Sequence, residues 1–101
     1  MKAPALTFRQ SLLSLVKTAE KSRLEKAKKI AQEGLILDLD VDLLRGVITA
    51  KVQGQGTAEY NVKVRPMTSS HRCDCLDFQR QGGMACKHII AVCGRTYKTL
   101  S

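Results

Sequence analysis

All four cysteines and both histidines of this 101-residue chain lie between His71 and Tyr97, in the stretch HRCDCLDFQRQGGMACKHIIAVCGRTY. A domain of this length buries only a modest part of its surface on folding, so its core alone supplies limited stability. The chain has two Phe, two Tyr and no Trp, which limits the core further. The clustering therefore favours a metal ion or a disulfide as an additional source of stability.

The spacing within the cluster favours a metal ion. Cys73-Asp74-Cys75 and Cys86-Lys87-His88 are separated by ten residues, which gives the pattern C-x-C-x10-C-x-H. Zinc prefers four tetrahedral ligands drawn from thiolate sulfur and imidazole nitrogen, and two close pairs joined by one loop supply them. Gly82-Gly83 gives that loop the freedom to reverse. We therefore predict one zinc ion bound by Cys73, Cys75, Cys86 and His88.

The predicted zinc is structural. Protein side chains fill all four positions, whereas a catalytic zinc keeps one position open for water. The H-x-E and P-C-x-x-C signature of zinc deaminases is also absent from the sequence. We expect no enzymatic activity and no small-molecule substrate.

The sequence also allows other arrangements of the cluster. The cysteines could form two disulfides, although disulfide frameworks belong mainly to secreted chains. Cys93 could act as a ligand, but its place on an apolar helical stripe is more simply that of a small buried residue. His71 could replace His88, but it is more simply an exposed loop residue. Redox sensing by released thiolates is a weaker option that no feature of the sequence singles out.

Helical signals occupy the first third of the chain. Thr7 and Gln10 have the spacing of a capping box, which predicts a helix start near Phe8, and Gly34 is placed to end the helix. A second capping box at Ser22 and Glu25 leaves two possibilities: one helix over residues 8–33, or two helices that break near residues 18–22. We treat residues 1–33 as a basic amphipathic helical segment.

Strand signals follow from Leu35, where Leu37, Leu39, Val41 and Leu43 alternate with three aspartates. Residues 47–53 and 59–65 predict two further strands, the last ended by Pro66. Residues 87–98 then show apolar spacing typical of a helix. We predict an α+β fold, with helical residues 1–33 followed by a single folded unit, residues 34–101, that holds a three-stranded antiparallel meander, a zinc-bound loop and a C-terminal helix.

The motif resembles the SWIM-type zinc finger, a family with C-x-C, a variable loop and C-x-H. CDCLDF and CKHIIAV are similar to its two ligand pairs, and the stretch before them, KAKKIAQEGLILDLDVDLLRGVITAKVQGQGTAEYNVKV, is similar to what precedes the finger in prokaryotic members. The resemblance covers roughly residues 26–97 and implies a small ββα-like zinc unit built onto the meander. Family members usually carry the finger in larger chains, such as transposases or recombination mediators. We expect a small stand-alone form without a catalytic domain, which leaves binding of DNA or protein as its role.

The formal net charge of +8 is unevenly spread. Residues 1–33 carry eight Lys or Arg against three Glu, residues 34–65 are balanced, and residues 66–101 carry five basic against two acidic residues. On the wheel of one continuous helix, four lysines share an arc away from the apolar stripe. We predict nucleic-acid binding, to duplex DNA in particular, through the basic residues Lys17, Lys21, Lys28, Lys29, Arg72, Arg80, Lys87 and Arg95.

The alternative is an adaptor that docks onto another protein, for example in a recombination or transposition complex, through the apolar stripe that contains Leu13 and Val16. The N-terminal residues lack the pattern of a secretory signal, and no window is apolar for long enough to span a bilayer. We therefore expect an intracellular protein without membrane contact, cytoplasmic in a prokaryote or virus-infected cell and nuclear in a eukaryote.

Overall fold

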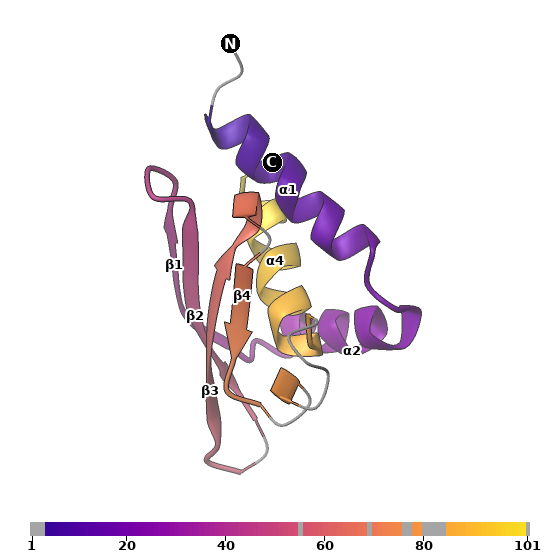
Figure 1. The fold of residues 1–101 in the computed structure, drawn as a ribbon. Coiled ribbons are helices and arrows are strands. Elements are labelled where there is room, and N and C mark those ends of the chain that lie inside the picture. Colours follow the sequence, from indigo (N-terminus) through magenta and orange to yellow (C-terminus); the bar gives the residue numbers. More distant parts are fainter. Residues whose placement is uncertain (1–3, 55, 69, 76–77, 80–84, 101) are drawn as a thin grey trace.

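The computed structural model describes residues 4–54, 56–68, 70–75, 78–79 and 85–100 (Figure 1). Its elements are, in chain order, α1 (Pro4–Lys17), α2 (Lys21–Gln32), β1 (Ile36–Asp42), β2 (Val47–Gln53), β3 (Glu59–Arg65), the 3-10 turn η1 (Pro66–Thr68), β4 (Ser70–Cys73) and α4 (Lys87–Thr99). The predicted α+β class is confirmed.

The N-terminal segment forms two helices, the second of the two possibilities left open by the sequence. The chain leaves α1 at Thr18, whose hydroxyl donates to the carbonyls of Ser14 and Leu15 at 3.0 and 3.2 Å. Such back-bonding by a threonine hydroxyl competes with continuation of the helix. α2 then starts at Lys21, because the Leu24 amide donates to the Glu20 carbonyl at 2.9 Å.

Both predicted capping boxes are wrong in position. α1 begins at Pro4 instead of near Phe8, since proline has no amide hydrogen to satisfy and its fixed φ suits the first helical residue. Glu20, and not Ser22, is the residue that precedes α2, so Ser22 lies inside the first turn. The end of α2 follows the prediction: Gly34 has φ of 69°, and the Gly34 and Leu35 amides donate to the Ala31 and Ile30 carbonyls.

The sheet has four antiparallel strands in the order β1-β2-β3-β4, so the predicted count of three is one too low. β4 pairs with β3 in a register that places Cys73 opposite Val62 and His71 opposite Val64. Its sequence, Ser-His-Arg-Cys, is short and polar and shows no apolar alternation, so the pairing with β3 decides its conformation. His71 is therefore not an exposed loop residue: it is half-buried in β4, and its ring forms a T-shaped contact with the ring of Phe78.

The first strand departs from simple alternation. The pairing of β1 with β2 shifts between Leu37 and Asp40, and Asp38 adopts a φ of 50° there. Aspartate tolerates this left-handed conformation better than branched residues do. Leu43, predicted to continue the buried face, instead lies in the turn after β1 and is 36% exposed.

The core lies between the sheet and the helices, which cover one face of the sheet (Figure 1). Inward side chains alternate along β2 and β3, as expected for strands with one buried face. The largest fully buried side chains include Phe8, Leu12, Ile48, Val52, Val64, Ile89 and Val92. Both α1 and α2 pack on α4, so the N-terminal helices join the same core as the sheet.

None of the helices in the described part of the chain combines the length and the apolar character needed to cross a membrane.

Candidate metal centre

The first ligand pair is delivered by β4 and the turn after it. Because successive side chains of a strand face opposite sides, Cys73 faces the helices while Arg72 faces outward. The residue between the ligands, Asp74, ties this turn to β3. Its carboxylate accepts hydrogen bonds from the Asn61 backbone amide at 3.2 Å and from Asn61 Nδ2 at 2.9 Å. This double anchor holds Cys73 and Cys75 against the sheet.

The second pair opens the last helix. Cys86 is the residue that precedes α4, its carbonyl accepts from the Ile90 amide at 3.0 Å, and His88 lies in the first turn. The predicted helix over residues 87–98 is confirmed to within one residue. Cys86 is 0% and His88 5% exposed, so both side chains are buried.

The four side chains converge as a metal site requires. One potential ligand atom from each of Cys73, Cys75, Cys86 and His88 lies within 4.8 Å of all the others. The Nδ1 atom of His88 is 3.7 Å from the Cys73 sulfur and 3.8 Å from the Cys86 sulfur.

These separations fit zinc. At usual zinc bond lengths and tetrahedral angles, sulfur and nitrogen ligands lie about 3.6 Å apart and two sulfurs about 3.8 Å apart. Three thiolates and one imidazole form a donor set that zinc favours, and together they fill its coordination. The centre is therefore a site for one structural zinc ion, with Nδ1 as the ligating atom of His88.

The electrostatics of the sulfurs point the same way. A hydrogen bond from the Cys73 thiol, with further ones from His88 and the Ile89 backbone amide, lowers the pKa of Cys86 to about 4 against the effect of burial. That same hydrogen bond and burial raise the pKa of Cys73, and burial raises the pKa of Cys75. One thiolate is thus favoured even without a metal, and a bound divalent cation supplies the positive charge that deprotonates the other two.

The alternative ligands and pairings are not formed. All four cysteines lie in the described part of the chain, and none is in a disulfide. Cys93 is 0% exposed on α4, and burial raises its pKa to about 12, as for a small core residue. Within the described ranges, Cys73, Cys75, Cys86 and His88 are the only group of metal-ligand residues close enough to share an ion.

Tyr60 supports the site and was not singled out by the sequence as part of it. Its ring packs on the ring of His88, with centroids 4.8 Å apart and planes inclined by 36°. Gly54 makes room for that ring, because a Cβ atom there would lie 2.5 Å from Cε2 of Tyr60. Gly54 directly follows β2, and Tyr60 is the second residue of β3 and pairs with Val52, so the β2–β3 register brings the two residues together.

Replacing Gly54 with Ala is expected to push the Tyr60 ring off His88 and to weaken zinc binding about tenfold, a typical cost of disturbing groups that orient a ligand. Competition with a chromophoric zinc chelator measures the affinity. The control is the same replacement in a Tyr60→Ala background, where the clash is relieved. An equal loss in both backgrounds would mean that the ring contact is not the cause.

The predicted nucleic-acid residues do not form one ridge. The shared arc of four lysines was predicted for one continuous helix, but Lys17 ends α1 while Lys21, Lys28 and Lys29 belong to α2. Lys29 and Lys87 line a hollow beside His88, whereas Lys28 and Arg95 line a groove between helices. Arg72 faces outward from the sheet, and Arg80 lies outside the described residues. Lys26, which was not among the residues predicted from the sequence, also lines the hollow beside His88. Its place there follows from the packing of α2 and is not visible in the sequence.

Residues 62–97 match the family model of the SWIM zinc finger. No curated protein and no solved structure matches the chain. The matched range begins on β3, includes β4 and runs into α4, and so it contains the strand, the turn and the helix that supply the four ligands. Residues 62–97 of this chain are therefore a SWIM zinc finger, whose metal ligands are Cys73, Cys75, Cys86 and His88.

Proposed function

We propose that this zinc-stabilised domain binds nucleic acid, with duplex DNA as its ligand, and that the zinc has no catalytic role. The hollow beside the finger supports this function. Its volume is about 710 Å³, and Lys26 and Lys29 from α2 and Lys87 from α4 line it together with His88. Three cations from two helices thus line one concave surface, a suitable arrangement for phosphate groups.

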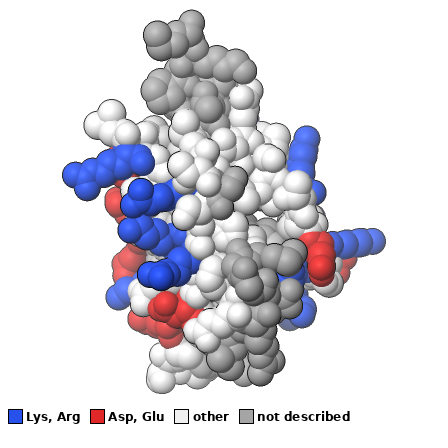
Figure 2. Space-filling view, in the orientation of Figure 1, with Lys and Arg blue, Asp and Glu red and all other residues white. Residues whose placement is uncertain are grey.

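The hollow has an excess of positive charge. Among the described residues that line it, Glu33 is the only acidic one, against three lysines. The outer face of the sheet differs, because exposed cations there are interspersed with exposed acids: Lys51, Lys63, Arg65 and Arg72 lie among Asp38, Asp40, Glu59 and Asp74. Figure 2 shows basic side chains bordered by acidic ones on the side of the molecule where the sheet lies. Mixed charge of this kind attracts a polyanion less than the finger side does.

A duplex suits the site better than a single strand. Single-strand recognition relies on aromatic rings that are free to stack on bases. Tyr60, the aromatic residue of this hollow, is engaged with His88 instead. Contacts from lysine to phosphate position a protein on the duplex backbone without reading its sequence, so we expect weak dependence on DNA sequence.

The test is a salt titration of affinity for a duplex oligonucleotide, followed by fluorescence anisotropy. The combined change Lys26→Gln, Lys29→Gln and Lys87→Gln is expected to reduce the slope of log K against log salt by about 2 to 3, since each phosphate contact contributes about 0.9. Zinc content and thermal stability of the variant are measured in parallel to verify that the finger is intact.

The matched control removes the same amount of charge from the outer face of the sheet, as Lys51→Gln, Lys63→Gln and Arg65→Gln. This variant is expected to retain the salt slope of the unmodified protein. Equal slopes for both triple variants would show that the change in salt dependence reflects net charge alone and not the hollow, which would contradict the proposed binding surface. The absence of measurable duplex binding at low salt would end the proposal.

A further inference from the structure

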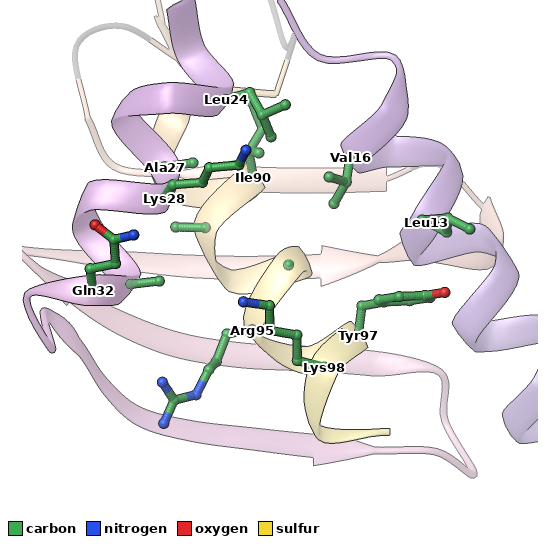
Figure 3. A pocket seen from close by; sticks show the side chains of 13 residues that line it. Leu13, Val16, Leu24, Ala27, Lys28, Gln32, Ile90, Arg95, Tyr97 and Lys98 are labelled. Carbon is green, nitrogen blue, oxygen red and sulfur yellow. The ribbon is translucent and has the colours of Figure 1, made fainter. Parts of the chain in front are cut away.

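An apolar groove runs between the three helices, on the side of α4 away from the sheet. Figure 3 shows α1 and α2 as its two walls with α4 between them. Its volume is about 430 Å³. Apolar side chains make up most of the lining: Leu13 and Val16 from α1, Leu24, Ala27 and Ala31 from α2, and Ile90 and Ala91 from α4.

Gly94, on the floor of the groove, has no role within the described fold. It occupies the middle of α4, and glycine is the poorest helix former after proline. A Cβ atom at this position would meet no atom within 4 Å, apart from its chain neighbours and the backbone of its own helix, so packing does not require glycine. Because glycine has no side chain, the backbone of α4 is accessible at this position, which permits close approach of a molecule from outside the chain.

The charges around the groove indicate the nature of that molecule. The charged residues that line it are Lys28, Arg95 and Lys98, and no acidic residue is among the described lining. An occupant therefore needs an apolar stripe for the floor and walls and negative charge at its edges. The lining extends from Leu24 to Gln32 on α2 and from Ile90 to Lys98 on α4, about two helical turns on each, so an elongated occupant fits better than a compact one.

We propose that this groove docks an amphipathic α-helix of a partner protein, with leucine-like side chains in the groove and Asp or Glu beside them. In helix-in-groove recognition, an amphipathic helix lays its apolar face into a hydrophobic groove, and its residues at i, i+3, i+4 and i+7 are the anchors. A second copy of this chain suits the groove poorly. Its own exposed helical residues are largely basic, including Lys17, Lys21, Lys26 and Lys29, and would meet the cationic rim.

The probe is a fluorescein-labelled peptide of about 18 residues built from Ala, Leu and Glu, with leucines at the helix-in-groove spacing. An isomer of the same composition, with leucines spread around the helix, controls for charge. At physiological salt, the amphipathic peptide is expected to bind the full-length chain at least about tenfold more tightly than the isomer. Equal binding of the two peptides would overturn the proposal.

Two substitutions at Gly94 separate docking from stability. Gly94→Leu fills the groove and is expected to raise the melting temperature while it reduces the advantage of the amphipathic peptide to within about twofold. Gly94→Ala adds only a methyl group and is expected to raise the melting temperature and to retain peptide binding. Unchanged affinity for the amphipathic peptide in Gly94→Leu would overturn the proposal. It would also be overturned if sedimentation equilibrium showed that the unmodified chain dimerises and that Gly94→Leu abolishes the dimer, because the occupant would then be a second copy of the chain.

The test is independent of duplex binding. Gly94→Leu is expected to leave the salt-dependent affinity for DNA unchanged, and the triple lysine variant of the finger hollow is expected to retain the preference for the amphipathic peptide. Loss of one activity without the other therefore identifies which of the two proposals fails.

Discussion

Replacement of Cys86 by Ser is expected to abolish zinc binding and to unfold the finger, so that the protein loses most of its cooperative thermal transition. Cys86 is 0% exposed, precedes α4, and its sulfur lies 3.8 Å from Nδ1 of His88. A structural zinc ion contributes on the order of 10 kcal/mol to the folding of zinc-finger peptides. Whole domains are stable by only about 5–15 kcal/mol, so this loss removes most of the stability.

Elemental analysis and circular dichroism with and without a strong chelator measure this effect. Chelation of the unmodified protein is expected to reproduce the loss, and added zinc to reverse it. Cys93→Ala is the matched control, because Cys93 is equally buried but lies outside the ligand cluster. We expect it to retain one zinc per chain and to lose only about 1 kcal/mol. A zinc-free protein with a native spectrum and an unchanged melting transition would contradict the account.

Replacement of Phe8 by Ala is expected to lower the free energy of unfolding by about 3–5 kcal/mol, the usual cost of deleting a fully buried ring. Phe8 is 1% exposed on α1, and α1 packs on both α4 and η1. Because α4 carries His88, the change is expected to shift the unfolding of the whole domain and not of the N-terminal helix alone. A single transition displaced in urea, with identical midpoints by far-ultraviolet dichroism and by zinc release, is the expected signature.

Leu44→Ala is the control for this prediction. Leu44 is 100% exposed in the turn between β1 and β2, so its replacement is expected to change stability by less than about 0.5 kcal/mol. Two separate transitions in Phe8→Ala, with zinc release unaffected, would show that residues 1–33 unfold as an independent segment.

The parts of the fold that depend on neighbouring residues were predictable. The limits of β2 and β3 follow from alternation and from Pro66, and the end of α2 follows from Gly34. Both rest on the conformational preferences of a few adjacent residues. One error arose where a second element decides, because β4 forms by pairing with β3. The errors at the two helix starts are local: α1 begins at Pro4 and α2 begins at Lys21, so neither capping box marks a helix start.

The candidate site divides in the same way. The pattern C-x-C-x10-C-x-H predicted the four zinc ligands, because each pair is local and zinc prefers four soft donors, while the structure excluded the disulfides and Cys93 that the sequence had left open. Only the tertiary structure placed Tyr60 on His88, brought Lys26, Lys29 and Lys87 around one hollow, and left Gly94 at the floor of a groove. Those contacts join segments distant along the chain, and their geometry depends on strand register and helix packing, which periodicity within one segment does not encode.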